Sequence, residues 1–298
     1  MNELVKKIIE LKKKKNAIIL VHNYQRPEIY KIADFIGDSL ELCRKAKETK
    51  ANIIVFCGVD FMAESAKILN PDKRVFLPEI QSRCPMAGMV NPDNVLAAKR
   101  RHPQAIVCSY VNTTAKVKAV SDICCTSANA VRVVNSLKEE EIIFTPDKNL
   151  ARYVQSRTNK RIIAVEGYCY VHDKILASDV EKAKRLHKDA EVLVHPECKM
   201  DVIKLADYVC STSQMVKRVK ESSSRKFIIV TEQGMVNRLR MERGDAEYYS
   251  IGGICIQMKK ITLEKVYDCL NNEKNEINIP EEIMVKAKKA LDRMLSIS

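Results

Sequence analysis

Short apolar runs alternate along the chain with longer segments in which apolar residues recur every three or four positions. The short runs are rich in β-branched residues, which is typical of strands buried on both faces of a sheet. We expect such strands at residues 17–21, 53–56, 74–77, 105–108, 141–144, 161–165, 191–194, 227–230 and 248–251. The segments between them have the period of amphipathic helices. This alternation predicts an α/β protein with parallel sheets covered by helices on both faces.

A seven-residue pattern of polar and apolar positions occurs three times in the chain. Its copies occupy residues 33–39, 121–127 and 206–212. Each copy has an aspartate at its second position, and an apolar run ends twelve residues before that aspartate. A spacing of roughly 86 residues is too long for a solenoid repeat and suits a small α/β domain. The pattern therefore indicates a tandem triplicate.

The repeat predicts three tandem Rossmann-like domains, each a three-layer αβα unit around a parallel sheet. Their expected boundaries are residues 1–86, 87–171 and 172–259. Two further helical patterns, at 262–270 and 280–295, predict a helical tail over 260–298 that packs back on the repeats. If the three domains surround a pseudo-threefold axis, equivalent positions of the repeats converge on that axis.

Polar side chains follow the first strand of each repeat, at the end where parallel sheets bind ligands. Residues at alternate positions leave an extended segment on the same side. The resulting pairs are His22 with Tyr24, Tyr110 with Asn112, and His195 with Glu197. We expect both histidines to titrate near neutrality, and Glu197, held among apolar walls, to have a raised pKa. The tyrosines can donate or relay protons.

A hydroxyl residue stands five positions after each repeated aspartate. The three residues are Ser39, Ser127 and Thr212. Each lies where a strand is expected to give way to a helix. Two interpretations are open and compatible: the hydroxyl caps the helix, or the hydroxyl and the helix N-terminus together bind an anion. Three such helix ends would hold a phosphate or two carboxylates.

Each repeat also contains a cysteine 47 to 50 residues after its aspartate. These residues are Cys84, Cys169 and Cys255. Three thiolates on one axis would leave one corner of a four-iron cluster open, and the open iron would act as a Lewis acid. His172, three residues after Cys169, is either a hydrogen-bond donor beside the cluster or a surface residue. The other eight cysteines are expected to be small buried apolar residues.

The charge balance favours anionic ligands. The chain has 51 Lys and Arg against 38 Asp and Glu, a net charge of +13. This charge leaves open a cluster-containing protein that binds nucleic acid, although an aromatic content of 5% argues against stacking on bases. A simple electron carrier would not explain why titratable residues repeat at the strand ends. We therefore expect an enzyme with small anionic substrates and no nucleic-acid partner.

The cysteines and the apolar runs also bear on the compartment. Eleven cysteines without a secretory signal indicate a reducing, cytoplasmic setting. No charge-free run approaches the ~18 residues of a membrane-spanning helix, so no membrane partner is expected. The chain has no Cys-x-x-Cys motif, so a metal centre must be assembled from distant segments. It also has no Gly-x-Gly-x-x-Gly or Gly-x-x-x-x-Gly-Lys motif for binding a nucleotide.

These residues lie in motifs that resemble those of the quinolinate synthase family over essentially the whole chain. The motifs are His22-Asn-Tyr-Gln25, Gly37-Asp-Ser39, Gly58-Val-Asp-Phe-Met-Ala-Glu64, Asn70-Pro-Asp-Lys73, Tyr110-Val-Asn112, Thr126-Ser-Ala-Asn-Ala130, His195-Pro-Glu-Cys198 and Cys255. The resemblance implies an iron–sulfur transferase of de novo NAD biosynthesis. Such an enzyme condenses iminoaspartate with dihydroxyacetone phosphate and forms quinolinate, phosphate and water. A transient hand-off of iminoaspartate from the enzyme that produces it remains open.

The resemblance also implies a [4Fe–4S] cluster on Cys84, Cys169 and Cys255, with the fourth iron facing the substrate. It places substrate contacts on His22, Ser39, Tyr110, Asn112, Ser127, His195, Glu197 and Thr212. Tyr24 and Glu197 would transfer protons, and His22 and Tyr110 would complete the catalytic set. Three positions depart from the family pattern and bear on the shape of the pocket, namely Arg83, Tyr168 and Ser213.

Overall fold

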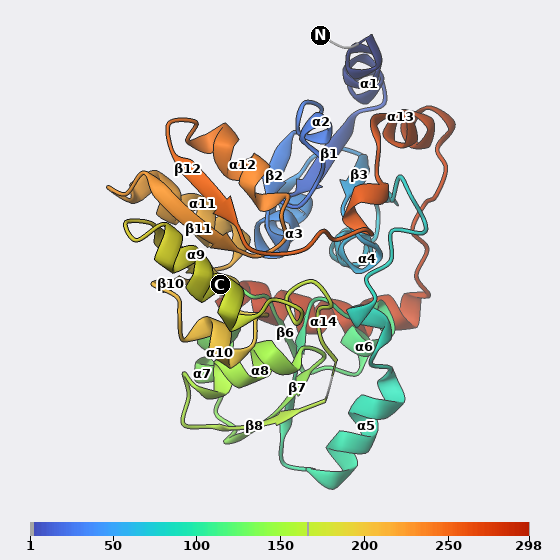
Figure 1. Cartoon of the computed structure of the whole chain (residues 1–298). Helices are drawn as coiled ribbons and strands as arrows, with labels where there is room; N and C mark the ends of the chain where they lie inside the picture. The colour runs from blue at the N-terminus through green and yellow to red at the C-terminus, as the bar shows by residue number, and fades with distance from the viewer. Residues whose placement is uncertain (1–2, 166, 298) are drawn as a thin grey trace.

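The computed structural model describes residues 3–165 and 167–297, which fold into three units and a C-terminal tail (Figure 1). The first unit contains α1 (Glu3–Lys14), β1 (Ala17–His22), α2 (Pro27–Tyr30), β2 (Phe35–Gly37), α3 (Ser39–Glu48), β3 (Ile53–Cys57), α4 (Asp60–Leu69) and β4 (Arg74–Phe76). The 3-10 helix η1 (Met86–Gly88) follows it. The apolar period of residues 2–15 predicts a helix there that Asn2 can cap. The helix is present as α1, and Asn2 lies outside the described residues.

The other two units repeat this order of elements. The second contains α5 (Pro92–Arg101), β5 (Ile106–Tyr110), α6 (Ala115–Ala119), β6 (Ile123–Cys125), α7 (Ala130–Ser136), β7 (Glu141–Thr145), α8 (Lys148–Gln155) and β8 (Arg161–Ala164). The third contains α9 (Ala177–Leu186), β9 (Glu191–Val194), α10 (Met200–Ile203), β10 (Tyr208–Val209), α11 (Thr212–Glu221), β11 (Lys226–Val230), α12 (Met235–Glu242) and β12 (Glu247–Ser250). The tail contains η2 (Met258–Lys260), α13 (Leu263–Asn272) and α14 (Glu281–Ile297).

Each unit has the same sheet. The strand orders are β2-β1-β3-β4, β6-β5-β7-β8 and β10-β9-β11-β12, and every pair is parallel. All nine strands expected from the apolar runs are present within two residues of their expected ends. The prediction of three tandem Rossmann-like αβα units is confirmed.

The repeated aspartate has a structural role that is the same in each unit. The backbone N–H of Asp34 donates to Ile19 O at 2.9 Å, and the N–H of Ile19 donates to Asp34 Oδ2 at 2.8 Å. Asp122 with Val107 and Asp207 with Val192 form the same reciprocal pair, with distances of 3.0 and 2.8 Å in both cases. The carboxylate therefore takes the place of a missing strand partner and aligns the short edge strand with the first strand of the unit.

The C-terminal helix α14 joins two of the units. It packs against α6, β6 and α7 of the second unit and against α4 of the first. Its buried face consists of Ala287, Ala290, Leu291 and Met294. Figure 1 shows α14, in red, crossing the middle of the molecule between the upper and lower sheets. None of the helices within residues 3–165 and 167–297 has both the length and the apolar composition needed to cross a membrane.

Candidate active site

The carboxyl ends of the three sheets face one cavity. It encloses about 690 Å³ of space, part of which is open to solvent. Its wall includes all twelve residues expected to act in catalysis, substrate binding or cluster binding, which are His22, Tyr24, Ser39, Cys84, Tyr110, Asn112, Ser127, Cys169, His195, Glu197, Thr212 and Cys255. Each unit contributes four of them, one being a cysteine. The convergence expected around a pseudo-threefold axis is therefore present in the structure.

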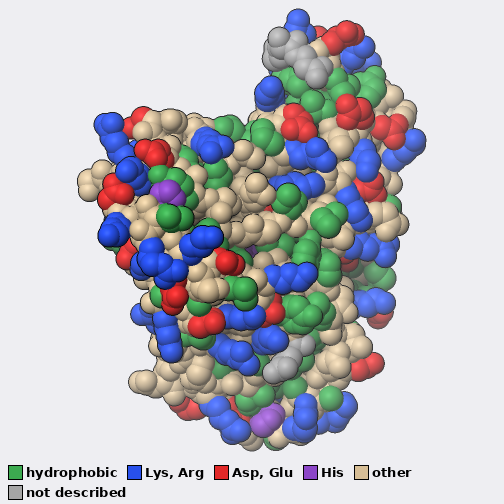
Figure 2. Space-filling view, in the orientation of Figure 1, with side chains coloured by type: hydrophobic (Ala, Val, Ile, Leu, Met, Phe, Trp, Pro, Cys, Tyr) green, Lys and Arg blue, Asp and Glu red, His purple; other side chains and the backbone are tan. Residues whose placement is uncertain are grey.

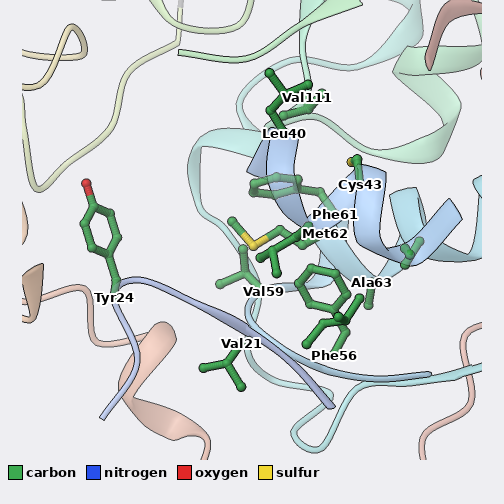
Figure 3. Close-up of a cluster of buried hydrophobic side chains, with 14 of the residues drawn as sticks. Val21, Tyr24, Leu40, Cys43, Phe56, Val59, Phe61, Met62, Ala63 and Val111 are labelled. Atoms are coloured by element: carbon green, nitrogen blue, oxygen red, sulfur yellow. The ribbon is translucent and has the colours of Figure 1, made fainter. Parts of the chain in front are cut away.

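His22 and Tyr24 enter the cavity directly after β1. Both side chains are buried, and their rings meet edge to face with centroids 4.9 Å apart. The Tyr24 N–H donates to His22 Nδ1 at 3.2 Å, which fixes the orientation of the imidazole. In Figure 3 the Tyr24 hydroxyl points away from the apolar cluster around Val59, Phe61 and Met62. The phenol is thus free to reach polar groups of the other units.

A buried chain of polar groups surrounds Glu197. Its Oε2 lies 2.7 Å from His172 Nδ1, and Asn112 Nδ2 donates to its Oε1 at 3.4 Å. His172 Nδ1 also lies 3.2 Å from Cys169 Sγ, and its Nε2 lies 2.8 Å from Thr231 Oγ1. His172 is only 1% exposed, so it is not a surface residue. It lies beside Cys169, as the other of its two interpretations expected. Thr231 had not been predicted, because it has no equivalent among the motifs singled out.

Two expectations about protonation were wrong. Burial lowers the pKa of His22 and of His195 to about 3, with further contributions from Lys259 for His22 and from His172 for His195. Both imidazoles are therefore neutral at physiological pH rather than titrating near it. Burial alone would raise the pKa of Glu197, but His172, His195 and a hydrogen bond from Tyr110 outweigh it and lower that pKa to about 2. Glu197 is an ionised carboxylate.

The phenols of Tyr24 and Tyr110 remain protonated in the cavity. Burial, and next the neighbouring Glu197 carboxylate, raise the pKa of Tyr24 and of Tyr110 well above the ordinary value. In the resting site these groups are hydrogen-bond or proton donors, and Glu197 is the acceptor. The site therefore places two protonated phenols beside the buried Glu197 carboxylate.

The hydroxyl residues do not cap the helices. Ser39 and Thr212 are the first residues of α3 and α11, and the caps are the preceding residues. Asp38 Oδ1 accepts from the N–H groups of Leu40 and Glu41 at 3.0 and 3.1 Å. Ser211 Oγ accepts from the N–H of Gln214 at 3.3 Å. The capping interpretation is wrong for Ser39 and Thr212, whose hydroxyls line the cavity instead.

Ser127 also does not cap a helix, since the N-cap of α7 is Asn129. The hydroxyl of Thr212 is held across the boundary between units, because Asn23 Nδ2 donates to its Oγ1 at 2.9 Å. Its own hydrogen can then be donated into the cavity. The N-terminus of α3 is a poorer anion site than that of α11, because a carboxylate, Asp38, already caps it.

The three candidate cysteines lie on the loops that follow β4, β8 and β12, and each is partly buried. Burial raises the pKa of all three thiols. Each cysteine N–H donates to a carboxylate: Cys84 to Asp60 at 3.0 Å, Cys169 to Asp147 at 3.2 Å, and Cys255 to Glu232 at 3.0 Å. The three acids had not been predicted. The sequence contained a signal that could have identified these acids, because an acidic residue stands 22 to 24 positions before each cysteine.

The cysteine set suits a multi-iron group better than a single ion. Within the described residues, the one set of three donors whose ligand atoms lie within 4.8 Å of one another is Cys169, His172 and Glu197. Cys84, Cys169 and Cys255 line the same cavity without meeting at one point. Three soft thiolates spread around a space, rather than gathered at a point, fit an iron–sulfur cluster. The other eight cysteines are free and buried, as expected.

The three departures from the family pattern lie outside the cavity wall. Tyr168 is 37% exposed, with the ammonium of Lys148 4.8 Å from the centre of its ring. Arg83 is exposed, and its Nε donates to Ile80 O at 3.4 Å. Ser213 bonds across to the first unit, where its Oγ accepts from the N–H of Asp38 at 3.1 Å and contacts the carboxylate of Glu41. None of the three narrows the cavity directly.

Comparison with known proteins covers the same three units and the tail. The sequence model of the family described as Quinolinate synthetase A protein matches residues 6–296. A protein of Methanocaldococcus jannaschii named quinolinate synthase is 52% identical over 99% of both chains. Quinolinate synthase 1 of Methanosarcina acetivorans is 52% identical over 99% of this chain and 98% of its own length. The quinolinate synthase of Pyrococcus horikoshii is 50% identical over 99% of both chains.

Proposed function

Because the chain belongs to the quinolinate synthase family, we propose that it condenses iminoaspartate with dihydroxyacetone phosphate to form quinolinate, phosphate and water. The reaction would serve the biosynthesis of NAD. The observation that carries this proposal is the meeting of three cysteines, three hydroxyls and the acid–base groups in one cavity. A purely structural role for these residues would not require their side chains to line one cavity.

Cys84, Cys169 and Cys255 would hold a [4Fe–4S] cluster. With only three thiolates, one iron would be open to substrate and would supply Lewis-acid assistance to the loss of hydroxide. Binding would release the thiol protons, because a cluster takes thiolates and burial keeps the free thiols protonated. The cysteines thus set where the reacting end of the substrate lies.

Glu197 is the group best placed to accept a proton. It is ionised in the resting site, and its pKa is low chiefly because His172, whose Nδ1 lies 2.7 Å from Oε2, stabilises the charged form. An anionic substrate bound against it would raise that pKa and make the carboxylate a stronger base. Tyr24 and Tyr110, both protonated, would donate to the oxygens that leave as water. His22 and His195, neutral because they are buried, would orient the substrate through hydrogen bonds.

The hydroxyls of Ser39, Ser127 and Thr212 would bind the anionic groups of the substrates. Thr212 has the strongest case, because Asn23 holds its oxygen and α11 presents its N-terminus there. Asn112, hydrogen-bonded to Glu197, would hold a substrate oxygen beside the base. The net charge of +13 would favour capture of these anions from solution.

The proposal is tested by assaying quinolinate formation with protein purified without oxygen. Iminoaspartate is generated in the assay from oxaloacetate and ammonia, dihydroxyacetone phosphate is added, and quinolinate is measured by chromatography. We expect quinolinate only when both substrates are present. Protein that carries its full complement of iron and sulfide but forms no quinolinate would contradict the proposed activity.

A further inference from the structure

Each candidate cluster cysteine is tied to a carboxylate that occupies the same place in its unit. Asp60, Asp147 and Glu232 follow the third strand of their units, which are β3, β7 and β11. The cysteines follow the fourth strands, and the backbone N–H of each cysteine donates to its acid at 3.0 to 3.2 Å. An acidic side chain just after the carboxyl end of an inner strand therefore holds each cysteine loop through the backbone N–H of the cysteine. Three independent copies of one contact indicate a common role.

Two of the acids divide their oxygens between two backbone N–H groups, and Glu232 also forms an ion pair with Lys259, whose Nζ lies 3.0 Å from Oε1. Asp147 Oδ1 accepts from Leu150 N at 2.7 Å while Oδ2 accepts from Cys169 N at 3.2 Å. Glu232 Oε2 accepts from Gly234 N at 2.7 Å while Oε1 accepts from Cys255 N at 3.0 Å. Each carboxylate thus links the start of the following segment to the cysteine loop. Both side chains are at most 1% exposed.

Asp60 makes the same link through one oxygen. Its Oδ1 accepts both from Phe61 N at 2.9 Å and from Cys84 N at 3.0 Å. An amide has one carbonyl oxygen, so asparagine at position 60 can keep both bonds. Asparagine at position 147 or glutamine at position 232 can keep only one, and its NH₂ group would then face an N–H. Asp60→Asn is therefore a matched control for Asp147→Asn and Glu232→Gln.

We propose that Asp60, Asp147 and Glu232 are positioning residues for the iron–sulfur cluster, and that they hold the cysteine N–H groups away from its sulfurs. The inference rests on the proposed function, since it presupposes that the three cysteines carry the cluster. Hydrogen bonds to the sulfurs and the net charge of the site both set the reduction potential of a cluster. Diverting three N–H groups to carboxylates lowers that potential. A cluster of low potential keeps its oxidised state, which suits a Lewis acid rather than an electron carrier.

The test compares Asp147→Asn and Glu232→Gln with Asp60→Asn and wild type, all purified and reconstituted without oxygen. Two quantities are measured: the rate at which an iron chelator removes iron, and the midpoint potential from a reductive titration followed by electron paramagnetic resonance. Loss of a partner that orients a metal ligand typically weakens metal binding 10- to 100-fold. We expect iron loss roughly 10- to 100-fold faster in Asp147→Asn and Glu232→Gln, with more positive potentials.

Asp60→Asn makes the same acid-to-amide change and keeps its two hydrogen bonds, so its iron should leave about as slowly as from wild type. Wild-type rates and potentials in Asp147→Asn and Glu232→Gln would overturn the inference. Equal acceleration in all three variants would also overturn it, because charge rather than the held N–H groups would then be responsible. Circular dichroism melting of the cluster-free proteins detects a variant that fails to fold. If wild type itself takes up no cluster, the proposed function fails and not the inference alone.

Discussion

The hydroxyl oxygen of Tyr24 lies 2.5 Å from Thr231 Oγ1, which connects the first unit with the third inside the cavity. The same Thr231 oxygen lies 2.8 Å from His172 Nε2, and His172 Nδ1 lies 2.7 Å from Glu197 Oε2. Four polar groups therefore form one continuous chain from the phenol to the carboxylate. Such a chain gives a proton a path between the two residues that the family resemblance assigns to proton transfer.

Replacing Thr231 with valine should interrupt this chain. The side chain is fully buried, and valine has nearly its shape without the hydroxyl. We expect turnover to fall by roughly 10²-fold, the lower range for general acid–base catalysis, with little change in KM. Leaving Tyr24 and His172 without this partner should also cost about 1–3 kcal/mol of stability. Thr231→Ser, which keeps the hydroxyl, is the matched control, and equal turnover in Thr231→Val and Thr231→Ser would show that the chain carries no proton.

Replacing Glu197 with glutamine should abolish most of the turnover and leave the cluster in place. Glu197 is ionised in the resting site, and glutamine of the same size cannot accept the proton. We expect the rate to fall by about 10²- to 10⁴-fold. Iron content and the visible spectrum should match those of wild type, since Glu197 is not one of the three cysteines. A variant that keeps full turnover would remove Glu197 from the reaction.

The sequence was sufficient for the fold and for the residues that line the candidate cavity. The period of the apolar positions and the β-branched content identified the strands. The equal spacings from Asp34, Asp122 and Asp207 showed which cysteines and polar residues are equivalent in the three repeats. The pKa values of His22 and Glu197 could not be predicted, because they depend on burial and on residues of other segments, which are Lys259 for His22 and His172 for Glu197. The acids that accept from the cysteine N–H groups were missed for a different reason. Acidic residues are common in the sequence, and only its hydrogen bond to Cys169 distinguishes Asp147 from the others.

Gly252 cannot carry a side chain without moving the Cys255 loop. A Cβ at this position would lie 1.9 Å from the backbone oxygen of Thr231, far inside van der Waals contact. Gly252→Ala should therefore displace the loop and lower the iron content. Gly253→Ala is the matched control, because its Cβ would meet its nearest atom, Val171 Cγ1, at 3.9 Å. The iron content of both variants is measured. A Gly252→Ala variant with as much iron as wild type would contradict the close contact between residue 252 and the Thr231 backbone.

Glu273 should contribute stability that is lost in acid. A hydrogen bond from Lys15, at 2.7 Å, and another from Arg74 lower its pKa from 4.5 to about 2. In the window between these values the unfolded chain binds more protons than the folded one, so stability falls as pH drops from 4.5 towards 2.

The check is urea unfolding of cluster-free wild type and Glu273→Gln between about pH 5.5 and about pH 3. The difference between their midpoints should be largest at the higher pH and should shrink as Glu273 is protonated. A difference that stays constant over this range would mean that the carboxylate is not stabilised by Lys15 and Arg74 in solution.

The central claim is that Cys84, Cys169 and Cys255 converge to hold one cluster. The measurement that tests it most directly is iron and acid-labile sulfide per chain in protein purified without oxygen, for wild type, Cys84→Ser and Cys269→Ser. Cys269 is a buried thiol that donates to Lys274 O at 3.2 Å, a bond that serine can replace. We predict about four iron and four sulfide in wild type and in Cys269→Ser, and loss of both in Cys84→Ser. A wild-type protein that takes up neither, or a Cys84→Ser variant that keeps both, would contradict the claim.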